Sequence, residues 1–414
     1  MRHETSHDPL SYLHSLEQFG IKFGLHNIRA LLARIGNPQQ TFRSIHIAGT
    51  NGKGSVTAMI DSVLRCAGHH SARYTSPHLI DLSERFAIDG QPVDTADMRQ
   101  SASVVQAAIE ALIGDGTLSG KPTFFEATTA MAFDLFRNAG VEIAVVEVGL
   151  GGRLDSTNVI DPIVTAIVSI DFDHQQYLGD TLAAIAGEKA GIIKPNVPVV
   201  VGHLPPEAYD VIARVARDRG AALLTTDDIG DDLRNAPLGL RGEHQRENAA
   251  VAVRVLETLE RLGVAIGRHA IFDGLANVTW PGRLDHRRLP NGREVILDAA
   301  HNPAGARALA SYLRGLGRER PTLVFGAMRD KDVDAMLTAL LPEIGRVIVT
   351  RPSNARAADP EELASRIRAL APALSIDVVA SPHDAVQSAT RHSPLVVVAG
   401  SIFLLGDIIQ EIGA

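Results

Sequence analysis

The sequence lacks the means to form an internal disulfide, because Cys66 is the single cysteine among 414 residues. Absence of disulfides is typical of a reducing compartment. Residues 1–9 are polar and contain no apolar core of the kind that a signal peptide needs. These features predict a cytoplasmic protein, in which Cys66 is a buried structural thiol rather than a nucleophile.

Long apolar runs are also missing, so we expect no segment that crosses a bilayer and no membrane partner. The formal net charge of −8 argues against nucleic acid as the main partner, although an acidic chain can still bind a nucleotide through local positive groups and metal. A chain that is 45% hydrophobic and 21% charged is normal for a soluble globular protein. Its length suggests two domains or a little more.

Residues 49–55 read G-T-N-G-K-G-S and lie between an apolar run, 45–48, and a helix-like segment, 56–67. This order of strand, glycine loop and helix is typical of a phosphate-binding loop, because glycines let backbone N–H groups approach phosphate oxygens at a helix start. Lys53 would reach the outer phosphates, and the Ser55 hydroxyl would meet a phosphate or its magnesium ion. The spacing departs from the common phosphate-loop pattern, since Gly54 separates the lysine from the serine. A glycine turn that binds nothing is the alternative, and the agreement of lysine, serine and flanking elements disfavours it.

Short apolar runs alternate with helical patterns through the chain, which predicts βαβ units and a parallel sheet. The expected strands are Ser44–Ala48, Glu142–Glu147, Ile163–Ile170, Val197–Val201, Glu294–Leu297, Thr322–Phe325, Arg346–Val349, Ile376–Val379 and Leu395–Ala399. The expected helices are Asn27–Ile35, Val56–Ala67, Asp97–Leu112, Glu126–Ala139, Thr181–Ala190, Pro206–Arg219, Gln245–Leu262, Ala304–Leu316, Pro360–Leu370 and Ser381–Ala389.

A domain boundary is expected near Trp280–Arg293, where proline and glycine cluster with charged residues before the α/β alternation restarts. We therefore predict an α/β protein with an N-terminal ATPase-like domain, 1–284, that carries the phosphate loop and a parallel sheet. A linker, 285–293, would join it to a smaller Rossmann-like α/β domain, 294–414.

Polar residues follow several of the expected strands. Glu147 ends one strand, and an acid at a strand end near a phosphate loop is a usual magnesium ligand. The next segment, 149–158, reads G-L-G-G-R-L-D-S-T-N and is built to approach a ligand, although a glycine turn with a solvated Arg-Asp pair is an alternative for any one of its residues. Asp171–His174, D-F-D-H, follows another strand; a lone histidine is more often structural, but beside two aspartates we favour a metal role for His174.

Other polar residues leave the choice open. Lys189 and Lys194 lie in G-E-K-A-G-I-I-K-P, and ordinary surface or helix-end roles are as compatible with the sequence as catalysis. Asp298 and His301 follow a strand of the second domain, which suggests a ligand crossing a cleft between the domains, with Asn302 capping the next helix. Arg283 could hold phosphate in a bidentate manner.

These segments together resemble folylpolyglutamate synthase, including its bifunctional dihydrofolate synthase form, within the Mur ligase superfamily. The resemblance spans nearly the whole chain and is carried by Gly49–Ser55, Thr75–His78, Phe125–Glu126, Glu147–Asn158, Asp171–His174, Gly187–Lys194, Pro281–Arg283 and Asp298–Pro303.

The resemblance implies roles for individual residues. ATP would be bound by Asn51, Gly52, Lys53, Gly54, Ser55, Asn248, Arg283, Asp298 and His301. Two magnesium ions are implied, with Ser55, Ser76, Glu147 and His174 as ligands. Lys53, His174 and Lys189 would be catalytic, and Lys189 resembles a family lysine that carries an N6-carbamate. The acceptor would be bound by Gly24, Leu25, Phe125, Leu154, Asp155 and Ser156.

The implied reaction is ATP-driven ligation of L-glutamate to reduced folates through an acyl phosphate, in a monomer. Bifunctional members carry an acidic residue before the Gly24-Leu25 pair, whereas this chain has Phe23, so dihydropteroate remains an open second acceptor. A Mur-type ligase of cell-wall precursors is one alternative, disfavoured because the phosphate loop starts already at Gly49. A regulatory ATPase that acts without glutamate is another.

Overall fold

The structure is a computed structural model of the 414-residue chain, and it describes residues 8–20 and 22–412. Contacts divide the chain into two compact units. The first comprises Met1–Pro237 and Glu247–Val278, and the second comprises Leu238–Arg246 and Thr279–Ala414. The segment 285–293, expected as a linker, contains strand β9, Asp285–Arg288, which pairs with β10.

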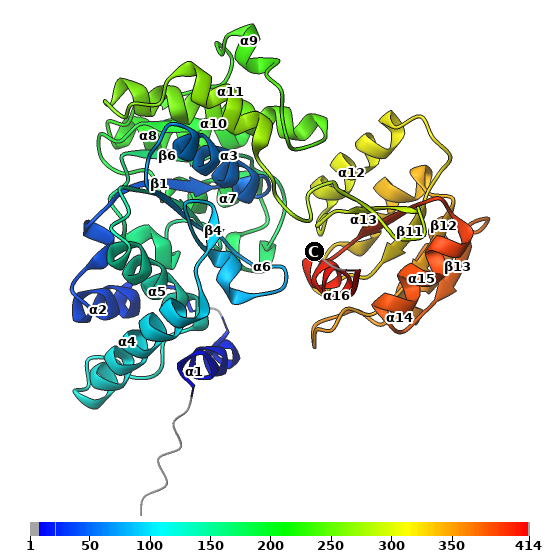
Figure 1. Cartoon of the computed structure of the whole chain (residues 1–414), viewed down its shortest axis with the longest axis horizontal. Coiled ribbons are helices and arrows are strands. Elements are labelled where there is room, and N and C mark those ends of the chain that lie inside the picture. Colours follow the sequence, from blue (N-terminus) through cyan, green and yellow to red (C-terminus); the bar gives the residue numbers. More distant parts are fainter. Residues whose placement is uncertain (1–7, 21, 413–414) are drawn as a thin grey trace, which may run out of the picture. The chain divides into compact units, whose positions relative to one another are not determined.

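The first unit is built on an eight-stranded sheet with the order β4-β3-β2-β5-β1-β6-β7-β8 (Figure 1). All of its pairings are parallel except those of β3 with β2 and β4. The strands are β1 Arg43–Ala48, β2 Ser71–Tyr74, β3 Phe86–Ile88, β4 Gln91–Pro92, β5 Ile143–Glu147, β6 Val164–Ile167, β7 Val199–Val201 and β8 Leu223–Leu224.

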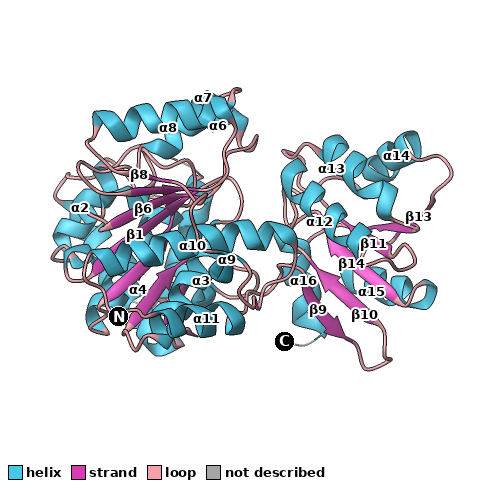
Figure 2. Ribbon diagram, turned by 90° about the horizontal axis from the view of Figure 1, so that it is seen from above, coloured by secondary structure: helices cyan, strands magenta, loops and turns pink. Residues whose placement is uncertain are grey.

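Helices cover both faces of this sheet, and Figure 2 shows α7 and α8 on one side with α3 and α11 on the other. The helices are α1 Pro9–Ser15, α2 His26–Arg34, α3 Lys53–Cys66, α4 Thr95–Gly114, α5 Phe124–Asn138, α6 Gln175–Leu178, α7 Leu182–Ala190, α8 Pro206–Asp218, α9 Asp231–Arg234, α10 Glu243–Arg261, whose first turn belongs to the second unit, and α11 Arg268–Asn277. Local sequence sets several starts: Thr123 and Glu126 form a capping box at α5, and the Thr181 hydroxyl accepts from Ala184 N at α7.

The register of the central strands sets where loops emerge. Ile47 of β1 lies beside Glu147, the last residue of β5, and also beside Ala166 of β6. Because these strands are parallel, the loops that follow them leave the same edge of the sheet. The sheet thus gathers the phosphate loop, Glu147 and the segment after β6 at one edge.

The second unit has a six-stranded sheet with the order β13-β12-β11-β14-β10-β9, parallel except for β9. Its strands are β9 Asp285–Arg288, β10 Glu294–Leu297, β11 Thr322–Phe325, β12 Arg346–Val349, β13 Ser375–Val378 and β14 Leu395–Ala399. Its helices are α12 Pro303–Gly315, α13 Val333–Leu340, α14 Pro360–Leu370, α15 Pro382–His392 and α16 Ile402–Ile412. Every residue of β14 is buried, as its wholly apolar sequence predicts.

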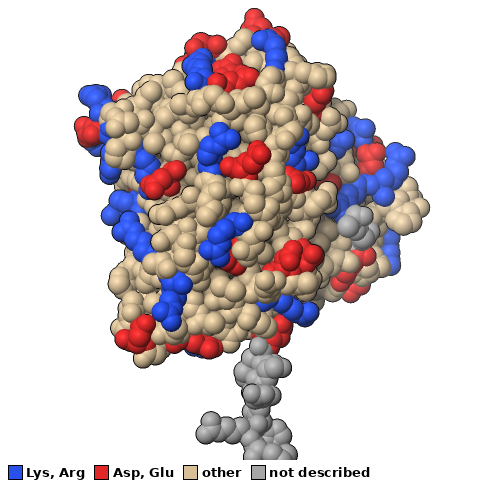
Figure 3. Space-filling model, turned by 60° about the vertical axis from the view of Figure 1, so that its left-hand side comes forward, with Lys and Arg blue, Asp and Glu red and all other residues tan. Residues whose placement is uncertain are grey.

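The predicted α/β class is confirmed: a phosphate-loop unit with a mainly parallel sheet is accompanied by a smaller α/β unit. The prediction missed the short antiparallel strands β3 and β4 and helix α11, among others. Within the described part of the chain, no helix combines the length and apolarity needed to span a membrane. On the face shown in Figure 3, Lys and Arg side chains lie among Asp and Glu, so its charge is mixed.

Candidate active site

The phosphate loop leads directly into the start of helix α3. Gly52 adopts a left-handed conformation (φ 81°) and α3 begins at Lys53. The Lys53 ammonium donates to the carbonyl of Gly49 at 3.1 Å and to that of Thr50 at 3.4 Å. A cation therefore lies beside the first turn of α3, where backbone N–H groups and the helix dipole favour negative charge. Gly54 and the buried Ser55 lie in that same turn.

Glu147 lies next to this loop. Its Oε1 is 4.0 Å from Lys53 Nζ, and its Oε2 accepts from the backbone N–H of Ser76 at 3.4 Å. The carboxylate is buried, with 5% of its surface exposed. Ser76 follows β2 and precedes a cis proline. The structure thus brings together the lysine, the carboxylate and one serine that were expected to act on phosphate and magnesium.

Lys189 reaches the same loop from the end of α7. Its ammonium donates to the Gly49 carbonyl at 3.0 Å, although only 4% of the residue is exposed. Burial, together with the nearby charge of Lys53, lowers the pKa of Lys189 to about 7. A lysine in this state supplies neutral amine near neutral pH, which an ordinary surface lysine does not. The surface role that the sequence left open for Lys189 is therefore wrong.

The segment Asp171–His174 is tied to the phosphate loop by backbone contacts. The Thr50 hydroxyl donates to the Asp171 carbonyl at 3.0 Å and accepts from the Asp171 N–H at 3.0 Å. His174 has a left-handed backbone (φ 51°) and immediately precedes α6. Its Nε2 lies 3.8 Å from Asp173 Oδ1. The fold therefore holds this imidazole and this carboxylate near the loop's threonine.

The sequence pattern by itself gave no sign that Asn248 lies beside the phosphate loop. As an amide inside a helix it would ordinarily face solvent, yet it is buried in α10 with 7% of its surface exposed. A Cβ built on Gly52 would lie 2.3 Å from Asn248 Oδ1 and 2.8 Å from Val168 Cγ1. The phosphate loop therefore requires glycine at 52 because Asn248 occupies the adjoining space.

The residues expected to bind the acceptor surround the glycine-rich segment after β5. The Phe125 ring packs on Gly149, where an added Cβ would lie 2.5 Å from the ring. Asp155 and Ser156 are buried at the start of a short 3₁₀ helix, and Leu154 lies half-buried in the preceding turn. Gly24 and Leu25 precede α2. Phe125 of α5 thus packs on the loop that leads to Asp155, but the Asp155 carboxylate is already engaged by the protein.

Asp155 is the centre of a buried hydrogen-bond network. Its carboxylate accepts from Leu150 N at 2.8 Å, from Thr157 N at 3.0 Å and from the Thr157 hydroxyl. The Thr157 hydroxyl has one proton, which goes to Asp155, so it accepts from His46 Nε2 at 2.8 Å. This assigns the His46 proton to Nε2. Burial raises the pKa of Asp155 and lowers that of His46 to about 3.

His46 and Thr157 were not foreseen from the sequence. His46 lies among Ile45, Ile47 and Ala48 in the buried part of β1, and the register places it beside Val146 and Thr165. The only available signal was a polar residue within a buried strand, which demands a hydrogen-bond partner. That signal could flag His46 but could not name Thr157.

The second unit contains its own group of polar residues. Asp298 is buried and accepts from Leu284 N at 2.9 Å and from Ala300 N at 3.0 Å. Burial raises the pKa of Asp298, and the charge of Arg283 opposes that rise. His301 Nδ1 contacts the Ala299 carbonyl at 2.8 Å. Asp298, directly after β10, thus lies close enough to Arg283, which precedes β9, for their charges to interact.

The Asn302 cap is confirmed. Its side chain accepts from Gly305 N at 2.9 Å at the start of α12.

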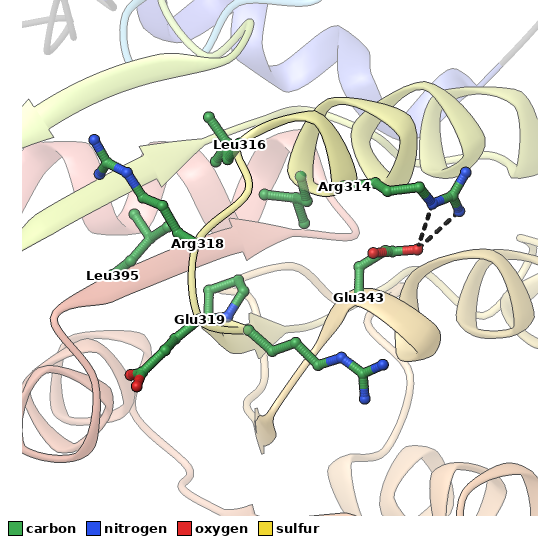
Figure 4. Close-up of a pocket in the computed structure, with 9 residues that line it drawn as sticks. Arg314, Leu316, Arg318, Glu319, Glu343 and Leu395 are labelled. Carbon is green, nitrogen blue, oxygen red and sulfur yellow. Dashed lines mark hydrogen bonds and ion pairs between the residues drawn. The ribbon is translucent and has the colours of Figure 1, made fainter.

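A surface pocket of the second unit lies elsewhere. Its lining includes Arg314, which donates to Glu343 at 2.9 Å, and residues 318–321 just before β11 (Figure 4). Leu395, the first residue of β14, completes it. These positions mark the amino ends of the parallel strands, whereas Asp298 follows a carboxyl end. The pocket therefore belongs to the sheet edge opposite the polar cluster.

Comparisons with known proteins place the chain in a family. Residues 282–402 match the family described as Mur ligase, glutamate ligase domain. The chain is 37% identical over 359 residues to the dihydrofolate synthase/folylpolyglutamate synthase of Bacillus subtilis (strain 168), covering 80% of this chain and 82% of that protein. It is 39% identical over 374 residues to the protein of the same name from Mycobacterium tuberculosis, covering 82% and 76% respectively.

Solved structures extend the likeness to the whole fold. The folylpolyglutamate synthase of Mycobacterium tuberculosis, complexed with ADP and AMPPCP, has a TM-score of 0.89, 35% identity and 98% coverage of both chains. E. coli FolC in complex with DHPP and ADP has a TM-score of 0.86 and 30% identity, covering 98% of this chain and 97% of that one. Fold and phosphate loop therefore define a protein of the Mur ligase class. Within that class, the chain belongs to the folylpolyglutamate synthase/dihydrofolate synthase family.

Burial of neutral His46 makes a prediction about stability. The His46 pKa is about 3 in the folded protein and about 6.5 when unfolded, so protons bind preferentially to the unfolded chain. The stabilisation is complete above about pH 6.5 and is lost as pH falls toward 3, at roughly 1.4 kcal/mol per pH unit. Urea unfolding of wild type and His46→Gln should be compared at pH 7, 6 and 5. The free energy of unfolding of wild type, relative to that of His46→Gln, should decrease as pH falls. A constant difference would contradict a neutral buried imidazole.

Proposed function

We propose that this protein is an ATP-dependent ligase that joins L-glutamate to reduced folates, with dihydropteroate as a second acceptor. The observation that carries the proposal is the convergence of Lys53, Lys189 and Glu147 on the loop after β1. Lys53 and Lys189 each donate to the Gly49 carbonyl, and Glu147 lies 4.0 Å from Lys53. Family membership supports the choice of substrates, since relatives carry both synthase names.

In the proposed reaction, an oxygen of the acceptor carboxylate attacks the γ-phosphorus of ATP. An acyl phosphate forms and ADP leaves. The amine of glutamate then attacks the acyl carbon, the amide bond forms, inorganic phosphate leaves and the amine proton passes to solvent. Lys53 and the N–H groups at the start of α3 would neutralise charge that grows on the transferred phosphoryl group.

The remaining nucleotide contacts are assigned by the same proposal. Asn51, Gly52, Gly54 and Ser55 would hold the phosphates, and Asn248 adjoins Gly52. Arg283, Asp298 and His301 would bind the nucleotide from the second unit. The complexes of similar proteins with ADP support the binding of a nucleotide.

The donor set suits magnesium. Ser55, Ser76, Glu147 and His174 supply hydroxyl, carboxylate and imidazole groups near the phosphate loop. Among residues 8–20 and 22–412, no three His, Cys, Asp or Glu side chains cluster as a metal cage. Magnesium is commonly held by one or two carboxylates together with substrate phosphates, so one carboxylate beside a phosphate loop fits it. The bound ions would neutralise phosphate charge.

Lys189 is proposed to carry a carbamate. In that step the neutral amine attacks the carbon of CO₂, an N–C bond forms and one proton leaves. Burial and a pKa near 7 favour the neutral amine that this step needs. The product exchanges a cation beside Lys53 for an anion, which removes the repulsion between the two lysines and offers a metal ligand.

The experiment that tests the function measures ADP release with ATP, magnesium and L-glutamate, comparing tetrahydrofolate with dihydropteroate. We expect turnover with tetrahydrofolate that depends on glutamate. Turnover with dihydropteroate as well would establish the bifunctional enzyme, and its failure would leave the folylpolyglutamate activity alone. A rate of ADP release that is the same with and without glutamate and acceptor would overturn the proposal and indicate a simple ATPase.

Removal of the Lys53 ammonium should cost at least about two orders of magnitude in kcat, since one charge-stabilising contact is commonly worth roughly 3–4 kcal/mol. Lys53→Ala would be compared with Arg99→Ala, which removes a positive charge from an exposed pair with Asp8 at 3.2 Å. Circular dichroism checks that both variants fold. Near-normal turnover of Lys53→Ala would contradict the assignment of residues 49–55 as the loop that binds the ATP phosphates.

Lys189→Ala should be inactive and partly restored by a small carboxylate such as formate, because the added anion replaces the carbamate. Lys189→Arg, which keeps the positive charge and cannot form this carbamate, should be inactive and not restored. ¹³C NMR after addition of labelled bicarbonate should show a carbamate signal in wild type and none in Lys189→Ala. Wild-type activity in the alanine variant, or the absence of that signal in wild type, would refute the assignment.

A further inference from the structure

Two aromatic rings that no assignment uses lie in contact at the protein surface. The centroids of Phe23 and Tyr177 are 5.8 Å apart, with ring planes tilted by 58°. Phe23 is 50% exposed and Tyr177 is 41% exposed. Single exposed apolar residues are ordinary, but paired rings that both remain exposed form a small apolar surface suited to binding another flat ring.

The pair connects two segments of the proposed site. Phe23 directly precedes Gly24, in the segment assigned to the acceptor. Tyr177 lies in α6, the helix that begins directly after His174, and its N–H donates to the His174 carbonyl at 2.9 Å. The ring contact therefore bridges the acceptor segment and the loop that carries His174.

Helix α6 is anchored to the glycine-rich loop while the Tyr177 ring remains exposed. Its next residue, Leu178, is buried, and Leu178 Cδ2 lies 3.0 Å from the position of a Cβ on Gly151. At Gly149 the same loop is covered by the Phe125 ring. The loop thus contacts one half-buried aromatic ring at Gly149, and near Gly151 it contacts the helix that carries Tyr177, one ring of the exposed pair.

The two acceptors of the proposed reaction differ in where their benzoyl ring must lie. In dihydropteroate the reacting carboxylate is attached directly to that ring. In tetrahydrofolate the reacting γ-carboxylate is separated from the ring by an amide and the glutamate side chain. Because both carboxylates must reach the same γ-phosphate, the ring of tetrahydrofolate has to lie farther from the phosphate loop.

We propose that Phe23 and Tyr177 form a rim subsite that holds the p-aminobenzoyl ring of glutamylated acceptors and favours them over dihydropteroate. The inference rests on the proposed function and adds a determinant of acceptor choice to it. Phe23 and Tyr177 are both more exposed than the half-buried Phe125, so the pair suits the ring of the longer acceptor, which extends farther from the reacting carboxylate, whereas Phe125 suits the ring of the shorter one. Stacking needs no charged partner, and the contact would act on acceptor binding rather than on phosphoryl transfer.

The test measures KM and kcat for both acceptors in wild type, Phe23→Ala and Tyr177→Ala. We expect the KM for tetrahydrofolate to rise about tenfold on loss of one ring, with kcat retained. The KM for dihydropteroate, ATP and glutamate should change less than about twofold. Tyr177→Phe and Phe23→Tyr keep a ring and should restore the wild-type KM. Tyr209→Ala, on α8, removes another exposed aromatic ring (36%) and serves as the matched control.

Equilibrium binding separates this inference from the proposed function. Calorimetric titration with p-aminobenzoyl-glutamate, which has the ring and the glutamate but no pterin, should show binding to wild type that weakens about tenfold in each alanine variant. Absence of ADP release with either acceptor would defeat the proposed function, while the titration would still report on the ring subsite.

Several outcomes would overturn the subsite itself. Equal increases in KM for both acceptors would indicate general support of the acceptor segment, and unchanged KM values would leave the pair without a role in binding. Unaltered binding of p-aminobenzoyl-glutamate in both variants would count equally against it. A later elution of Phe23→Ala from size exclusion, with unchanged KM, would instead make the pair a contact between copies of the chain.

Discussion

Two lysine side chains donate to one backbone carbonyl, and the arrangement of the phosphate-loop unit depends on this contact. Lys53 and Lys189 come from different helices, and both reach the Gly49 oxygen. Two positive charges at such close quarters repel each other, and the fully buried one is the easier to neutralise. Lys53 differs in that it lies 4.0 Å from the carboxylate of Glu147. The loop therefore holds one lysine paired with a carboxylate and one buried amine whose pKa is lowered to about 7.

The parallel sheet makes this convergence possible. Strand register places Glu147 beside Ile47, so the carboxylate and the phosphate loop leave the sheet together. The alternate residues of β1 point to the other face, where His46 meets Thr157 and, through it, Asp155. One six-residue strand therefore organises phosphate chemistry at its carboxyl end and the acceptor loop on one of its faces.

Sequence reasoning succeeded where local signals and fold agree. The strands Glu294–Leu297 and Leu395–Ala399 were predicted with their observed bounds, because compact apolar runs flanked by polar residues leave little choice. The prediction failed where contacts between residues remote in the sequence determine the structure. Helix α11 contains Gly274, a poor helix residue whose absent side chain lets the helix approach Val63, since an added Cβ would lie 2.5 Å from that backbone. Asn248 looked like an ordinary surface amide for the same reason: its neighbour Gly52 is remote in the chain.

The contact between Gly52 and Asn248 also constrains how related chains can diverge. A side chain at 52 would collide with the amide oxygen and would have to adopt a left-handed backbone as well. A shorter side chain at position 248 would remove the collision but not the need for a left-handed backbone. No single compensating substitution therefore makes a side chain at position 52 acceptable. The backbone conformation therefore restricts position 52 to glycine. The residue at position 248 can vary, provided that the nucleotide can still bind. Substitutions at the two sites should appear in homologues as an asymmetric pair, with glycine kept even where the asparagine is lost.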